Sequence, residues 1–126
     1  MFRIFFSSLL LAAAAHAASA DAMTSADMKR CKAMAATMAP KKAEIETLEA
    51  KRDELAAVTE TEGEAWEDAE VMRLASSGHA QAADERKQSY TEAKKKFLAT
   101  EQALQSMTRQ FNQDVISYNQ SCSTGN

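Results

Sequence analysis

Residues that break helices are scarce in this chain of 126 residues, which contains three glycines and one proline. Segments in which β-branched and polar residues alternate, the usual sign of a strand, are missing as well. The chain is rich instead in Ala, Glu, Lys, Gln and Leu, which all favour helix. The composition therefore predicts an all-α protein and argues against a fold built on a β-sheet.

Side chains that commonly perform catalysis are also few. The sequence has two histidines, and one of them, His79, falls at a predicted turn, where a solvated side chain is the ordinary outcome. The carboxylates from Glu60 to Asp68 are numerous, but such a run is typical of a solvated helix face. We therefore expect a protein that is not an enzyme and that has no cofactor.

A concentrated positive charge is missing too, because 15 basic residues stand against 18 acidic ones and the net charge is −3. This balance disfavours binding to nucleic acid, which requires a positive face, and docking to anionic lipid. The apolar run from Ile4 to Ala15 is shorter than the roughly 20 residues that span a bilayer.

That run has the features of a secretory signal peptide. Arg3 precedes it, and small residues of the A-x-A form recognised by signal peptidase follow at 15–17 and 18–20. We expect residues 1–20 to be removed, which leaves a single domain over 21–126 and no attachment to the membrane. A signal this short favours the bacterial periplasm, where the oxidising conditions allow cysteines to pair.

Cys31 and Cys122 lie at nearly equal distances along the chain from the turn signal Ser-Ser-Gly-His at 76–79. A first helical arm over about 25–75 and a second over about 80–119, followed by a frayed tail, would bring the two thiols together. We therefore predict a long antiparallel helical hairpin, similar to a two-stranded coiled coil, that is clasped by a disulfide at its open end.

Apolar periodicity supports this hairpin. In the second arm, large apolar side chains recur every seven residues, at Tyr90, Phe97, Leu104, Phe111 and Tyr118. In the first arm, Cys31, Met34, Met38, Ile45, Leu48 and Leu55 occupy positions of an alternating three-and-four pattern, which continues through Thr59, Glu62, Trp66 and Ala69. We expect these two sets of residues to form the contact between the arms, which we call the seam.

The cysteines also fix the register, since facing residues then have numbers that sum to about 153. Leu55 is expected to face Phe97 and Leu98, and the acidic segment 44–70 to pair with the basic residues over 86–96. Such exposed ion pairs contribute about 0–1 kcal/mol each, so they specify register more than stability. A single seam leaves apolar flanks exposed, and a homodimer that forms a four-helix bundle would cover them.

Two positions can interrupt the first arm. Pro40 lacks a backbone donor and disfavours helix at the residue before it, so a kink is expected there. Gly63 interrupts a polar stretch, and Thr61 with Glu64 resembles a capping box that would begin a new helix. The alternative fold is therefore a three-helix arrangement with a break near Gly63.

Two clusters are candidates for function. Trp66, Val71, Met72 and Leu74 lie near the turn, and we expect them to form an apolar surface for a protein partner. The predicted function is that of an exported, non-enzymatic helical protein that acts through protein contacts as an adaptor, chaperone-like protein or assembly component.

The alternative is a small periplasmic copper-binding protein. Thioethers are favoured ligands of monovalent copper, and Met28, Met34 and Met38 can share a helix face around Cys31. Methionine also fills irregular gaps in cores, and a paired Cys31 is lost as a ligand.

Overall fold

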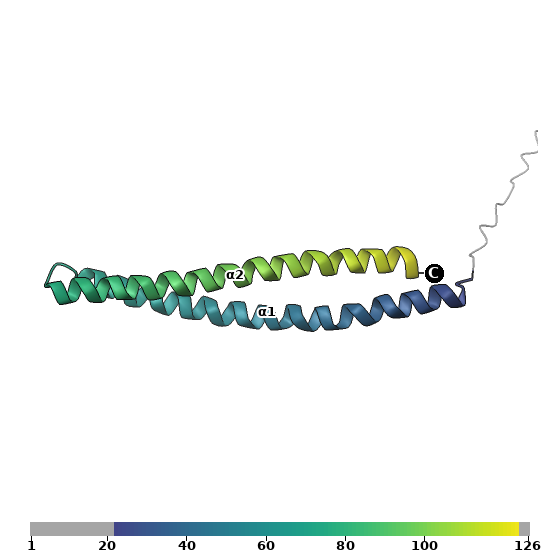
Figure 1. Cartoon of the computed structure of the whole chain (residues 1–126), viewed down its shortest axis with the longest axis horizontal. Helices are drawn as coiled ribbons and strands as arrows, with labels where there is room; N and C mark the ends of the chain where they lie inside the picture. The colour runs from purple at the N-terminus through teal and green to yellow at the C-terminus, as the bar shows by residue number, and fades with distance from the viewer. Residues whose placement is uncertain (1–21, 124–126) are drawn as a thin grey trace, which may run out of the picture.

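The protein is an antiparallel hairpin of two long helices. The computed structural model describes residues 22–123, which form α1 (Ser25–Val71) and α2 (Ser77–Cys122). The two helices pack side by side, and α2 ends near the place where α1 begins (Figure 1). The predicted fold class is confirmed, while the predicted signal peptide lies outside the described residues.

The open end of the hairpin is closed by a disulfide between Cys31 and Cys122. The two Cα atoms lie 5.6 Å apart and the S–S distance is 1.99 Å, which are ordinary values for a disulfide. The bond joins residues that are 91 positions apart in the sequence. The predicted clasp is confirmed, and with it the pairing of the arms.

The turn lies earlier in the chain than the sequence indicates. Met72 caps the end of α1, and Ser76 caps the start of α2, so the connection covers 72–76 rather than 76–79. The backbone N–H of His79 donates to the Ser76 hydroxyl at 3.2 Å. Serine is favoured both in turns and at helix N-caps, and here the cap prevails. At its other end α2 continues to Cys122, beyond the predicted end at 119.

The first helix begins with a capping box. The backbone N–H of Asp27 donates to the Thr24 hydroxyl at 3.1 Å, and the N–H of Thr24 donates to the Asp27 carboxylate at 3.2 Å. The hydrogen bonds from Thr24 lower the pKa of Asp27 below its ordinary value. Two of the four unpaired N–H groups at the helix start are thereby satisfied.

The three-helix alternative is wrong, because α1 runs without interruption through both Pro40 and Gly63. The predicted capping box at Thr61 does not form; the Thr61 hydroxyl instead donates to the carbonyl oxygen of Ala57 at 3.1 Å, one helical turn earlier. Packing against α2 on both sides of these positions outweighs the local penalties, as tertiary contacts commonly do.

The predicted seam is confirmed along both helices. The most deeply buried described residues are Cys31, Ala83, Ala93, Thr100 and Leu104. The other predicted seam residues are half-buried: Met34, Met38, Ile45, Leu48, Leu55, Thr59, Glu62, Trp66, Tyr90, Phe97, Phe111 and Tyr118. The core is thus one narrow line of side chains between two helices. Leu98, expected to face Leu55, is instead 53% exposed.

Two basic residues also occupy the seam. Lys41 and Arg52 continue the spacing of three and four in α1, and both are half-buried. The ammonium of Lys41 donates to the carboxylate of Asp114 on α2, whereas Arg52 donates to Asp53 on its own helix. The apolar pattern in the sequence gave no sign of these residues, because it has gaps at both positions.

Candidate functional site

The tip of the hairpin, which we define as Val71, Met72 and Leu74, is the most exposed apolar surface at the closed end of the fold. The exposed fractions are 83% for Val71, 48% for Met72 and 98% for Leu74. These residues form the end of α1 and part of the turn, so they project at the end opposite to the disulfide (Figure 1). Three of the four residues predicted as a partner-binding surface therefore lie together.

Trp66, the fourth predicted residue, belongs to a different part of the molecule. Its ring stacks on Tyr90 of α2, with centroids 5.4 Å apart and an angle of 26° between the planes. Such an aromatic pair stabilises the contact between the helices by about 0.5–1.5 kcal/mol beyond its buried area. Trp66 thus holds the two helices together just below the tip and is not part of its exposed surface.

Arg73 fixes the conformation of the tip. Its guanidinium donates to the Glu70 carboxylate at 2.6 Å and to the Asp84 carboxylate at 2.8 Å, which links the end of α1 to the first part of α2. These hydrogen bonds raise the pKa of Arg73 and the one from Arg73 lowers the pKa of Glu70, so both groups stay charged. The exposed apolar residues are therefore carried on a braced turn.

The turn is also closed by backbone hydrogen bonds. The N–H groups of Met72 and Arg73 donate to the carbonyl oxygens of Ala69 and Glu70, and the N–H of Ala75 donates to that of Met72. These bonds satisfy carbonyl groups at the end of α1 that would otherwise be unpaired. They keep Leu74 projecting outwards from a compact loop.

Lysines lie over the aromatic pair instead of pairing with the acidic segment of α1. The Lys87 ammonium is 5.7 Å from the centre of the Trp66 ring, and that of Lys94 is 5.6 Å from the centre of the Tyr90 ring.

Within residues 22–123, the ion pairs between the helices are Lys41–Asp114 and Arg73–Asp84. The predicted pairing of 44–70 with 86–96 is therefore wrong at the level of direct contacts. Aliphatic stems of lysine pack well along apolar surfaces, which favours the observed arrangement.

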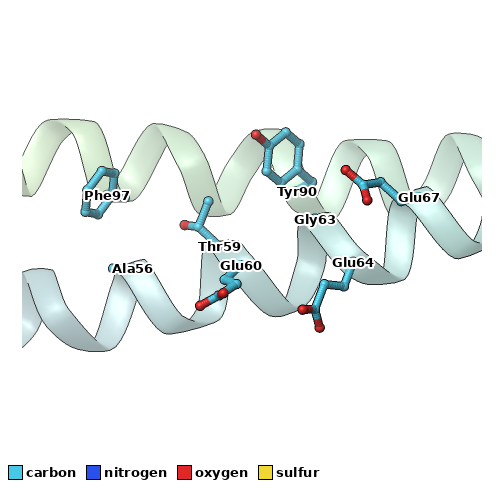
Figure 2. Close-up of a pocket in the computed structure, with 8 residues that line it drawn as sticks. All are labelled: Ala56, Thr59, Glu60, Gly63, Glu64, Glu67, Tyr90 and Phe97. Atoms are coloured by element: carbon cyan, nitrogen blue, oxygen red, sulfur yellow. The ribbon is translucent and has the colours of Figure 1, made fainter.

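An open groove of about 490 Å³ lies between the helices next to the aromatic pair. Its floor is formed by Ala56, Thr59 and Gly63 of α1 with Tyr90 and Phe97 of α2 (Figure 2). Its remaining lining is acidic and consists of Glu60, Glu64 and Glu67. Figure 2 shows that the carboxylate of Glu64 is directed away from α2. The sequence showed Gly63 as a helix breaker and gave no indication of this groove.

The methionines predicted as a copper site are distributed over two environments. Met34 and Met38 are half-buried in the seam, whereas Met28 is 53% exposed. Cys31 is bonded to Cys122, so a thiolate ligand is absent from this site. Among the described residues, no group of three or more His, Cys, Asp or Glu side chains is placed to hold a metal ion. A copper site here would thus have thioether ligands alone.

Neither helix within residues 22–123 has an apolar stretch long enough to cross a membrane. Comparison with known proteins yields no relative: no family model matches the chain, and no curated protein or solved structure is similar to it.

Proposed function

We propose that this protein is an exported, non-enzymatic helical hairpin that binds a protein partner through its tip, as an adaptor, chaperone-like protein or assembly component. The observation that carries this proposal is the exposure of Leu74 and Val71, at 98% and 83%, on a turn held by Arg73. Covering apolar surface is favourable by roughly 25 cal/mol per Å². Apolar residues grouped on a braced, projecting turn are thus suited to binding.

The charges beside the tip define the partner that fits it. Glu67 and Asp68 lie within four residues of the tip in sequence, and neither forms an ion pair within the described residues. Negative charge around an apolar centre favours a partner with an apolar pocket bordered by Lys or Arg. It disfavours an anionic lipid surface as the target.

Export is part of the proposal and is supported by the disulfide. Disulfides form and persist in oxidising compartments such as the bacterial periplasm. In the reducing cytosol disulfides are rare. The measurement that tests export is the intact mass of the protein isolated from a periplasmic fraction. We expect a mass corresponding to a chain that begins at Asp21 and lacks two hydrogens because of the disulfide. A full-length chain confined to the cytosol would contradict the export step.

Site-specific crosslinking tests the role of the tip. A photoreactive benzoyl-phenylalanine at position 74 should give a discrete protein adduct in cells that produce the full chain. The same group at Gln81, an exposed polar position on α2, serves as the control and should give none. Adding Val71→Ser and Met72→Ser to the position-74 probe should abolish the adduct. An equal adduct from position 81, or one that survives the double substitution, would place the contact elsewhere.

A further inference from the structure

The groove side of the hairpin carries unpaired charges of opposite sign on its two helices. Glu60 and Glu67 of α1 line the groove, and Lys87 and Lys94 of α2 lie over the rings beside it. The two glutamates are seven residues apart, and so are the two lysines, so the members of each pair lie in line along their own helix. Within residues 22–123 none of the four forms an ion pair. One edge of this face is therefore acidic and the other basic.

Gly63 keeps the floor of the groove open. Glycine in a helix interior costs about 1 kcal/mol relative to alanine. A Cβ atom at this position would meet the Tyr90 ring at 3.4–3.5 Å, which is ordinary van der Waals contact. The packing of α1 on α2 therefore does not require glycine. What the missing side chain provides is access to the rings of Tyr90 and Phe97, which line the groove.

We propose that a second copy of this chain covers the groove, in a four-helix dimer whose two tips lie at the same end. The two-fold axis runs parallel to the helices, and α1 of each copy packs against α2 of the other. Rotation about such an axis leaves every residue at its own height along the hairpin. Within one hairpin, the disulfide and the Trp66–Tyr90 pair show that residues at equal height have numbers that sum to about 153–156.

That height rule brings the unpaired charges together. Glu60 of one copy comes level with Lys94 of the other, and Glu67 comes level with Lys87. Both pairs occur twice because the interface is two-fold symmetric. The other face-to-face arrangement has tips at opposite ends and sets α1 against α1. In that arrangement Glu60 and Glu67 face α1 of the other copy, so they do not meet Lys87 and Lys94 on α2. Charge thus selects the arrangement with both tips together.

The available area is sufficient for a stable dimer. A helix of 46 residues is about 69 Å long at 1.5 Å per residue, and a contact about 10 Å wide along it covers roughly 700 Å² per copy. Specific protein interfaces bury about 600–1,000 Å² per partner, so this area lies within their range. The thin core of the single hairpin would become the layered core of a four-helix bundle.

Charge reversal tests the pairing directly. Light scattering on the oxidised, signal-cleaved protein should give twice the monomer mass at about 100 µM. Glu60→Lys with Glu67→Lys should weaken association at least tenfold, and so should Lys87→Glu with Lys94→Glu, with helicity unchanged by circular dichroism. An equimolar mixture of the two variants should dimerise again, since every reversed residue then meets its opposite. A monomeric wild-type protein, or a mixture that stays dissociated, overturns the proposal.

The orientation has its own measurement. A nitroxide on Gln81→Cys, with the native disulfide intact, should give a distance between copies of about 30 Å or less when both tips lie at one end, because the bundle is two helix diameters wide. Tips at opposite ends would separate the labels by about 60 Å and overturn the arrangement. The variant Val71→Ser with Met72→Ser should remain dimeric. Loss of tip binding and loss of dimerisation are therefore distinguishable.

Discussion

Lys41 of α1 and Asp114 of α2 form an ion pair across the seam, with the Lys41 Nζ 2.5 Å from the Asp114 Oδ2. The side chains are 28% and 34% exposed, so both are partly removed from water. The pair lies between Met38 and Ile45, at a height where the neighbouring seam positions are apolar. Partial burial costs each charge some hydration, and sliding one helix past the other would separate the two. The pair therefore specifies the register of the clasped half.

Replacing both members of this pair should show that it contributes to register and not to net stability. We expect Lys41→Leu combined with Asp114→Leu to leave the melting temperature unchanged or to raise it, because apolar side chains then complete the seam. The single change Asp114→Leu should lower it, since the Lys41 ammonium stays partly buried without its partner. Thermal unfolding of the three proteins, followed by circular dichroism, measures both effects. A double variant less stable than the native protein would show that the pair is a net source of stability.

Removal of the disulfide should be the most destabilising change at the open end. A closed loop of 91 residues corresponds to about 4–5 kcal/mol in the chain-entropy treatment. The single changes Cys31→Ser and Cys122→Ser should each lower the melting temperature substantially, while helicity at low temperature stays near that of the native protein. Reduction of the native chain should reproduce the effect, and reduction should not affect the Ser variants. Equal melting temperatures for the reduced and the oxidised protein would contradict a stabilising role of the disulfide.

The tip should contribute little to stability, in contrast to the seam. Val71→Ser with Met72→Ser alters side chains that are already exposed, so the melting temperature should barely change. Leu104→Ala removes a side chain that is 6% exposed and should cost about 2–5 kcal/mol. Chemical denaturation of both variants gives the comparison. A tip variant that unfolds as early as Leu104→Ala would mean that these residues are part of the core.

Gly63→Ala should stabilise the hairpin. The added methyl group meets Tyr90 at ordinary contact distance, and alanine is favoured over glycine in a helix by about 1 kcal/mol. We expect a higher melting temperature and no loss of helicity. Gly78→Ala in the first turn of α2 is a matched comparison, because its Cβ would meet only the Ser76 hydroxyl oxygen, at 3.7 Å. A fall in stability at position 63 with a gain at position 78 would indicate that the Tyr90 ring cannot accommodate the methyl group.

Acid should loosen both ends of α1. The pKa of Asp27 lies below its ordinary 3.8 because of the hydrogen bonds from Thr24, and that of Glu70 lies below 4.5 because of the hydrogen bond from Arg73. A lowered pKa in the folded state means stability that is present above the unfolded-state pKa and is lost as the pH falls through the folded one. The protection of amides at the helix ends, measured as the hydrogen-exchange rate relative to the intrinsic rate at the same pH, should therefore fall as the pH is lowered from about 5 to 3. Asp27→Asn should flatten that dependence at the start of α1 only.

Much of the fold follows from the sequence, and the misses have identifiable causes. The seven-residue spacing from Tyr90 to Tyr118 predicts the seam, because residues seven apart lie on one face of a helix and a contact between two helices buries only one face of each. Lys41 was missed because the pattern considered apolar side chains alone, although its position continues the same spacing. The sequence places Ser76 in the turn, because serine is favoured both in turns and at helix caps and the residue type alone does not separate the two.

The candidate site was predicted less completely. The place of Val71, Met72 and Leu74 near the turn predicts that they lie together, as they do, while their role in binding stays a prediction. Proximity in sequence groups Trp66 with these residues, whereas its spacing from Glu62 places it in the seam, where the structure has it. The groove depends on how Gly63 of one helix meets Tyr90 of the other. To predict such a contact between distant residues, the register of α1 against α2 must be known to within one residue. The sequence indicates that register only approximately.

The position of the disulfide has a topological consequence for a chain with an exposed turn. Cys31 and Cys122 close residues 31–122 into a covalent ring, and Leu74 lies about midway around it. A protease that cuts the chain once beside Leu74 opens the ring but releases neither helix. The nicked molecule keeps its mass, apart from one added water, and separates into two fragments only after reduction. Cleavage at the most accessible turn therefore yields a two-chain protein in which α1 and α2 are still joined.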